Sequence, residues 1–167
     1  MSISTMTELN EEDIAIDEAR TFVGPNASFY DESWRVMMWR GKRTSWNAHA
    51  ALLGPVWFAY RRMFVSALTW IGWLQFVWIA HARGWPHWLL LTLVAAAMLT
   101  SGLLANGAYL QHFQRCASRA RKVSDSVLEQ EKCLRTEGGT SPMAAYACVA
   151  LVVVQSVLNL AGSLATG

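Results

Sequence analysis

The sequence predicts an all-α membrane protein with three transmembrane helices, preceded by an amphipathic helix and a short interfacial or kinked helix. Uncharged stretches of 18, 23 and 22 residues occupy positions 63–80, 88–110 and 143–164. A bilayer core about 30 Å thick requires about 20 residues of helix. The chain also contains nine Trp residues, a residue type that concentrates at membrane–water boundaries. The three stretches are therefore expected to form a transmembrane domain over residues 63–164.

Charge divides the region before the first span into two parts. Residues 1–32 carry eight acidic residues and one Arg, whereas residues 33–62 carry six Lys or Arg and no acid. We expect residues 1–21 to form a disordered acidic tail with at most one frayed helix over residues 11–20, because they are polar and poor in aromatics. The basic part lies beside a span, which favours contact with a membrane surface over binding of nucleic acid. The lipid bilayer is thus an expected partner, and nucleic acid is not.

Residues 22–62 are expected to contain an amphipathic helix and an interfacial helix. The first, over residues 27–40, places Trp34 and Met37 at near-helical spacing. It would lie either on the cytoplasmic membrane surface or against the protein's own core. The second, over residues 46–60, is too short to span and is interrupted at Gly54-Pro55. We expect two short pieces there, or one kinked helix.

Basic and small residues near the spans are the candidate contact residues. Tyr60, Arg61 and Arg62 directly precede the first span. They would anchor the topology by contacting lipid phosphates or, alternatively, bind an anionic ligand. Helix packing is expected at Gly54, Pro55, Gly102 and Asn106, because small residues permit close approach and polar ones bond across helices.

The positions of the basic residues predict the orientation. Of the 14 Lys and Arg residues, only Arg83 lies in the connection between the first two spans, and none follows the third. The positive-inside rule therefore places the N-terminus and a helical loop over residues 111–139 in the cytoplasm, with residues 81–87 and the C-terminus outside. Nothing near the N-terminus resembles a signal peptide, so the spans are expected to remain uncleaved.

Several segments resemble a known family. The residues Ser45-Trp-Asn47 and the run Gly54-Pro-Val-Trp-Phe-Ala-Tyr-Arg-Arg-Met63 resemble the core of a bacterial family called domain of unknown function 2628. Weaker similarity lies in residues 22–30, 106–112 and 138–141. The chain departs from the family at Ala48, His49, Leu52 and Leu53, where aromatics are usual. The resemblance implies a small multi-pass inner-membrane protein, and it implies no activity.

Histidine and cysteine patterns leave one alternative open. On the predicted topology His81 and His87 share the outer face, while His49 and His112 share the inner face. Either pair could bind a metal, although His with its polar tip in interfacial water is the commoner arrangement. Cys116 has cationic neighbours that favour a thiolate, but a passive Cys is the simpler interpretation. We expect no catalytic, metal or cofactor-binding residue and no cofactor.

These features favour a non-enzymatic membrane component, an accessory or scaffold subunit that binds a membrane-protein partner or forms a homo-oligomer. An alternative is an oligomeric channel or transporter subunit for a small or anionic solute. The spans contain Gln75, Gln155 and Asn159 but no Asp, Glu, Lys or Arg, which argues against a proton-coupled transporter acting alone. A haem- or metal-binding redox subunit is the third hypothesis.

Overall fold

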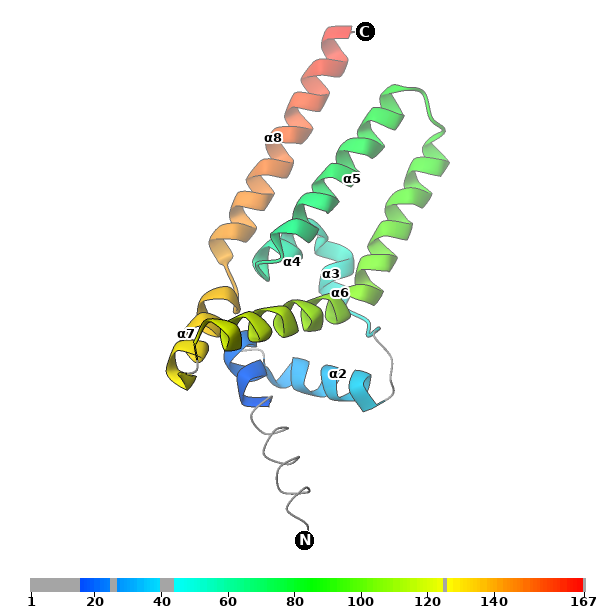
Figure 1. Ribbon diagram of the computed structural model, residues 1–167. Coiled ribbons are helices and arrows are strands. Elements are labelled where there is room, and N and C mark those ends of the chain that lie inside the picture. The colour runs from blue at the N-terminus through cyan, green and yellow to red at the C-terminus, as the bar shows by residue number, and fades with distance from the viewer. Residues whose placement is uncertain (1–15, 25–26, 40–43, 125, 167) are drawn as a thin grey trace. The chain divides into compact units, whose positions relative to one another are not determined.

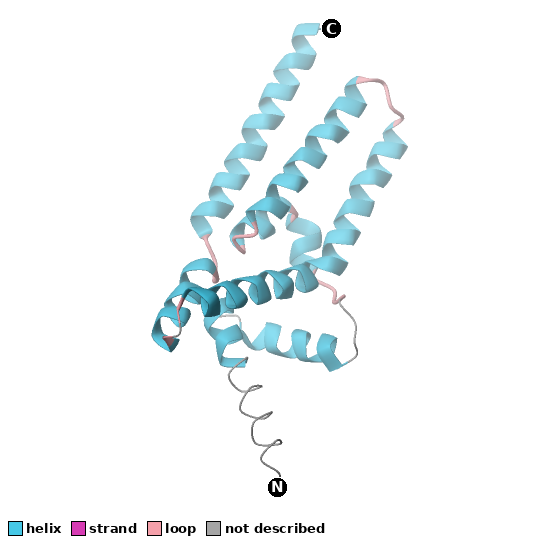
Figure 2. Ribbon diagram, in the orientation of Figure 1, coloured by secondary structure: helices cyan, strands magenta, loops and turns pink. Residues whose placement is uncertain are grey.

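The structure is a computed structural model that describes residues 16–24, 27–39, 44–124 and 126–166. This part of the chain is helical and contains no strand (Figures 1 and 2). Residues 16–23 form the first helical segment. The helices that follow are α2 (Ala27–Trp39), α3 (Ala48–Leu53), α4 (Pro55–Tyr60), α5 (Phe64–Ala82), α6 (His87–Val123), α7 (Val127–Glu137) and α8 (Pro142–Thr166).

Three helices, α5, α6 and α8, are long and apolar enough to cross a membrane. The predicted all-α class with three membrane-spanning helices is therefore confirmed. The helices extend past the predicted spans, most of all α6, which has 37 residues. At 1.5 Å per residue it is about 55 Å long, which exceeds a hydrocarbon core of about 30 Å. The second half of α6 can therefore extend beyond the bilayer.

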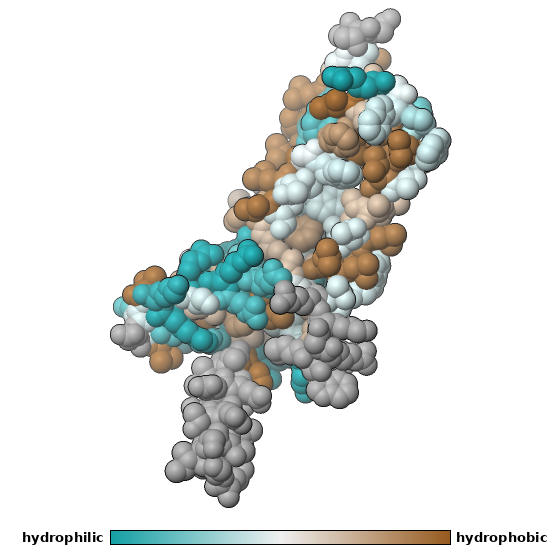
Figure 3. Space-filling model, turned by 45° about the vertical axis from the view of Figure 1, so that its right-hand side comes forward, coloured by the Kyte–Doolittle hydropathy of each residue, from teal (hydrophilic) through white to brown (hydrophobic). Residues whose placement is uncertain are grey.

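The chain divides into two compact units, each with its own contacts. The span unit comprises residues 46–105 and 141–167, and the aromatic-core unit comprises residues 1–45 and 106–140. Helix α6 runs from the first unit into the second. This division differs from the predicted one, because α3 and α4 belong with the spans rather than with the residues that precede them. On the face shown in Figure 3, hydrophobic and intermediate residues cover most of the span unit.

Helix α5 is the central element of the span unit. Its Trp70 Nε1 donates a hydrogen bond to Ser101 Oγ of α6 at 2.7 Å. Its Gln75 Oε1 accepts hydrogen bonds from two amides of α8. The short helix α4 packs against both α5 and α8. These polar side chains therefore connect the three spans. Apolar contacts alone would select the neighbouring helix poorly, because lipid is equally apolar.

The aromatic-core unit is built around the second half of α6. Rings from residues 16–23 and from α2 pack on α6: Phe22 lies 5.6 Å from Tyr109, and Trp34 stacks on Phe113 at 5.7 Å, measured between ring centroids. Trp34 and Met37 of α2 are buried. Of the two placements predicted for this helix, the structure therefore shows packing on the protein's own core.

Part of the predicted acidic tail is helical, in a segment that begins within the range expected for a frayed helix. Residues 16–21 are helical, and Glu18 pairs with Arg121 of α6 while Arg20 pairs with Asp31 of α2. The buried ring of Phe22 at the end of this segment explains the order, because it inserts into the aromatic core. The rest of the tail, residues 1–15, lies outside the described residues.

Candidate functional sites

The break predicted at Gly54-Pro55 lies at the centre of a bend between α3 and α4. Gly54 has φ +47° and ψ −118°, a conformation that favours glycine, and Pro55 occupies the first turn of α4. A Cβ on Gly54 would lie 3.7 Å from the Trp70 ring. Asn47 starts α3 by accepting a hydrogen bond from Ala50 N. The bend thus turns the chain from α3 into α4, which packs against α5 and α8.

A second sharp corner follows α4, at the basic residues. Arg62 N donates to Ala59 O and Met63 N donates to Phe58 O, the pattern that ends helices in a Schellman motif. The left-handed residue of this motif is usually Gly, but here it is Arg62 with φ +59°. An L-residue in this conformation costs about 1–2 kcal/mol. The chain therefore places a basic side chain at a position where glycine would adopt the backbone conformation without this free-energy cost.

The neighbouring Arg61 is buried, with 4% of its surface exposed. Its guanidinium lies 5.7 Å from the centroid of the Tyr60 ring, within the range of a cation–π interaction. The carbonyl of Tyr60 accepts a hydrogen bond from Ser141 N, just before α8. Tyr60, Arg61 and Arg62 are therefore brought together at a corner that also anchors the start of the third span.

The predicted packing residues Gly102 and Asn106 contact segments of this same chain. A Cβ on Gly102 would lie 2.7 Å from the ring of Trp46 and 3.0 Å from Ala51 Cβ, and the Gly102 carbonyl accepts from Asn47 N. Asn106 is buried, and its amide donates to Ser45 Oγ at 3.2 Å. Both residues thus pack the segment that leads into α3 rather than presenting an open face.

An amide cluster joins α5 and α8 near the middle of both helices. Gln155 Nε2 and Asn159 Nδ2 both donate to Gln75 Oε1, the second at 3.1 Å. Each of the three residues is half-buried. Amides in lipid are stabilised by bonding to each other across helices. The cluster satisfies polar groups that the sequence places within two spans.

The four histidines occupy three different surroundings. His81 and His87 face each other across the α5–α6 turn, with ring centroids 5.1 Å apart. His49 is exposed on α3 in the span unit. His112 lies in the aromatic-core unit, 5.7 Å from the ring of Phe22. Only the predicted outer pair is therefore brought together within one unit.

Burial shifts the pKa of two ionisable groups in the aromatic-core unit, His112 and Cys116. It lowers the pKa of His112 below its ordinary value, and the charge of Arg119 adds to that effect. Burial also raises the pKa of Cys116 to about 12, together with a hydrogen bond to Glu137. Cys116 is therefore a neutral thiol at physiological pH, and its arginine neighbours do not activate it. Among the described residues, no group of three or more His, Cys, Asp and Glu could hold a metal ion.

The contact between Phe22 and Gly139 in the aromatic-core unit was not predictable from the sequence. The sequence indicated no relation between Phe22 and Gly138-Gly139. In the structure Gly139 N donates to the Phe22 carbonyl, and the Phe22 side chain is fully buried. The adjacent glycines and the aromatic residue before Gly24-Pro25 were visible signals, but a pairing 117 residues apart has no local pattern.

Comparison with known proteins adds one match. A family described as "Protein of unknown function (DUF2628)" matches residues 26–115, more than half of the chain. The matched region contains α2 to α5 and most of α6, including the α4 corner and the His81–His87 pair. No curated protein and no solved structure matches the chain.

Proposed function

We propose that this chain, which belongs to the DUF2628 family of proteins of unknown function, is a non-enzymatic accessory or scaffold subunit of the bacterial inner membrane. Its partner would be another membrane protein or a second copy of the chain. The proposal starts from the way the span unit uses its polar groups. Trp70 and Gln75 of α5 bond to α6 and α8, so α5 holds the unit together.

The observation that carries the proposal is the outer face of α6. Thr92, Ala96 and Thr100 recur every four residues on one face of this helix, and all three are exposed. The two threonine hydroxyls donate to carbonyls of their own helix, Trp88 O and Ala96 O. The small residues on this face, which lie beside the exposed Leu99 and Leu103, permit another helix to approach closely in lipid. This face therefore supports a role in contacting a second transmembrane helix.

The predicted orientation places the aromatic-core unit in the cytoplasm. Its α6 and α7 segments carry exposed basic side chains, among them Arg115, Arg119 and Lys122. In this orientation Tyr60, Arg61 and Arg62 would lie at the cytoplasmic boundary, where the partly exposed Arg62 would meet lipid phosphates. Cys133 offers a direct test, because it is partly exposed on α7. A membrane-impermeant maleimide should label it in inverted vesicles but not in intact spheroplasts. The reverse pattern would overturn the orientation.

Purification in mild detergent tests the accessory role. The wild-type chain should co-purify with a stoichiometric membrane protein, or as a defined oligomer of itself. The double variant Ala96→Leu/Thr100→Leu should lose that association, because bulky residues block close helix approach. The matched control is Ala147→Leu on the exposed surface of α8, which should retain it. A chain that elutes alone as a monomer, or equal behaviour of the two variants, would contradict the proposal.

One observation favours the alternative of an oligomeric channel or transporter subunit. The amides of Gln75, Gln155 and Asn159 are only half-buried in the middle of their helices. Such groups in several copies of the chain could line a path for a small polar or anionic solute. Flux of a small anion through liposomes that contain only this chain would support the alternative, and the absence of flux would weaken it.

A further inference from the structure

The turn between α5 and α6 brings two exposed histidines together. His81 lies in the last turn of α5 and His87 is the first residue of α6. Their rings are 5.1 Å apart at an interplanar angle of 79°. The His81 ring also contacts Trp78 of α5, at 5.8 Å. Both histidines are exposed to solvent, so the pair is accessible from the aqueous phase.

The backbone of the turn sets the position of both rings. Trp85 N donates to Ala80 O and Gly84 N donates to His81 O, which together form a Schellman motif with Gly84 at φ +80°. Pro86 lies directly before α6, and its carbonyl accepts from Leu89 N and Leu90 N. These bonds fix the backbone between the two histidines, so a ligand that needs both rings has only their side-chain torsions to order.

The geometry points to a divalent transition-metal site, and we propose that His81 and His87 together bind one Ni²⁺, Cu²⁺ or Zn²⁺ ion. A metal bonded to one nitrogen of each ring at 2.0–2.1 Å and at a tetrahedral angle would place the ring centres about 5 Å apart. The observed centroid separation of 5.1 Å is compatible with this value, although the rings lie edge to face and must rotate to aim one nitrogen each at a shared ion. Two imidazoles supply two ligands, and water would complete the coordination at the exposed turn.

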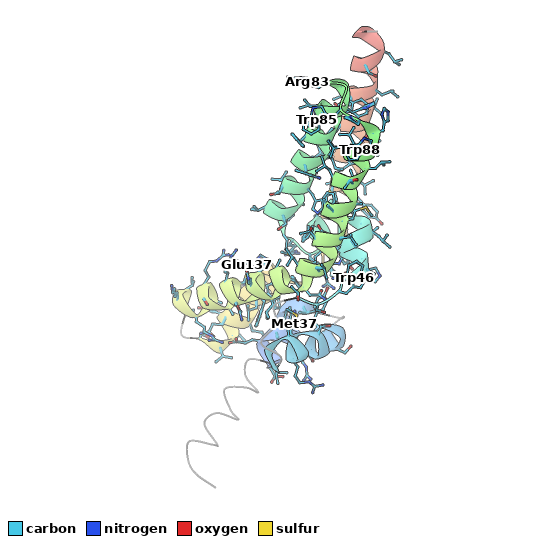
Figure 4. The ribbon with its side chains drawn as sticks, turned by 90° about the vertical axis from the view of Figure 1, so that its right-hand side faces the viewer. Met37, Trp46, Arg83, Trp85, Trp88 and Glu137 are labelled. Atoms are coloured by element: carbon cyan, nitrogen blue, oxygen red, sulfur yellow. The ribbon has the colours of Figure 1, made fainter. Side chains whose placement is uncertain are left out.

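The chemistry of the turn restricts the choice of metal. Residues 81–87 contain no Asp or Glu, so the protein ligands are nitrogen atoms only. Imidazole suits Zn, Cu and Ni, whereas Ca²⁺ and Mg²⁺ prefer oxygen ligands. Arg83 lies in the same turn as the pair (Figure 4). Its positive charge opposes the binding of any cation, so the bonds to imidazole must provide the affinity.

Isothermal titration of the full chain with Ni²⁺ in detergent tests this site. The protein carries no histidine tag, and its cysteines are blocked with N-ethylmaleimide, because thiols also bind such metals. We expect one Ni²⁺ per chain, together with a higher midpoint of thermal unfolding, since the ion binds the folded turn. The variants His81→Gln and His87→Gln should each lose at least about tenfold in Ni²⁺ affinity, because one imidazole ligand is gone.

The matched control is His49→Gln, which removes another exposed histidine of the same unit. It should bind Ni²⁺ as the wild type does, and the circular dichroism of all variants should be unchanged. Equal affinity in the wild type and both turn variants would overturn the site. An equal loss in His49→Gln would also overturn it, because the binding would then be a general property of exposed histidines. A chain that associates with a partner but binds no Ni²⁺ would refute the metal site and leave the proposed function intact.

Discussion

Gly138 lies directly against Phe22. A Cβ on Gly138 would be 2.6 Å from the Phe22 Cδ2 atom and 2.8 Å from the Leu134 carbonyl oxygen. The next residue, Gly139, donates its backbone N–H to the Phe22 carbonyl. These contacts attach the loop after α7 to the helical segment at residues 16–23. Small size at position 138 is therefore a requirement of the aromatic-core unit.

Gly138→Ala should destabilise this unit by about 1–3 kcal/mol through overpacking. The backbone at Gly138, φ −91° and ψ −157°, is extended and suits alanine, so the cost is steric. Near-ultraviolet circular dichroism during thermal unfolding in detergent would measure it. Gly72→Ala is the control, since a Cβ there meets nothing within 4 Å. Equal stability of Gly138→Ala and the wild type would show that the loop can move away from Phe22.

Gln75→Leu should loosen the contact between α5 and α8, because Gln155 and Asn159 lose their shared acceptor. Double-mutant cycles with Asn159→Leu should give a coupling of about 0.6–1.7 kcal/mol, the range for interhelical hydrogen bonds in membranes. Unfolding by SDS in mixed micelles would report it. Thr69→Val is a matched control on α5, because the Thr69 hydroxyl bonds only to its own helix at Val65 O. Zero coupling would mean that the amides do not bond in the membrane.

Arg62→Gly should be more stable than Arg62→Ala by about 0.5–1 kcal/mol, because glycine adopts a positive φ without steric cost. Both variants remove the same charge, so their difference isolates the backbone conformation. Thermal unfolding of the two variants in detergent measures it. A more stable alanine variant would show that Arg62 does not hold the left-handed conformation.

The pH dependence of stability should reveal His112. Burial, with the charges of Arg119 and Arg115, lowers its folded pKa below the ordinary value of 6.5, while Glu137 acts in the opposite sense. Below about pH 6.5 the unfolded chain therefore binds a proton more readily than the folded one. The contribution of neutral His112 is present above pH 6.5 and is lost as the pH falls through the folded pKa.

Unfolding of the aromatic-core unit between pH 7.5 and 5 would measure this loss. The variant His112→Gln should flatten the acid side of the stability profile, because the titrating group is gone. The exposed His49→Gln variant should keep the wild-type profile. An unchanged acid slope in His112→Gln would assign the dependence to other groups.

The helices were predictable from sequence because each carries a local signal. Uncharged length identified the spans, and Gly54-Pro55 marked the division between α3 and α4. The pattern of Trp34 and Met37 predicted a helix with one apolar face. It did not decide what covers that face, because a membrane and a ring such as Phe113 demand the same side chains.

The candidate sites were predictable only in part. Sequence position grouped Tyr60, Arg61 and Arg62, and the predicted topology grouped His81 with His87. Packing partners such as Trp46 for Gly102 were not predictable, because they depend on how distant segments meet. The left-handed conformation of Arg62 was also missed, since it arises where α4 ends between α5 and α8 rather than from its own side chain.

The hydrogen bond from Ser141 N to the Tyr60 carbonyl has a consequence for biogenesis. The acceptor leaves the ribosome about eighty residues before its donor, so the first two spans are synthesised while this carbonyl awaits its partner. The last helix is therefore the last element to reach the span unit. Shortened chains that end before residue 141 should consequently be substrates for membrane quality-control proteases.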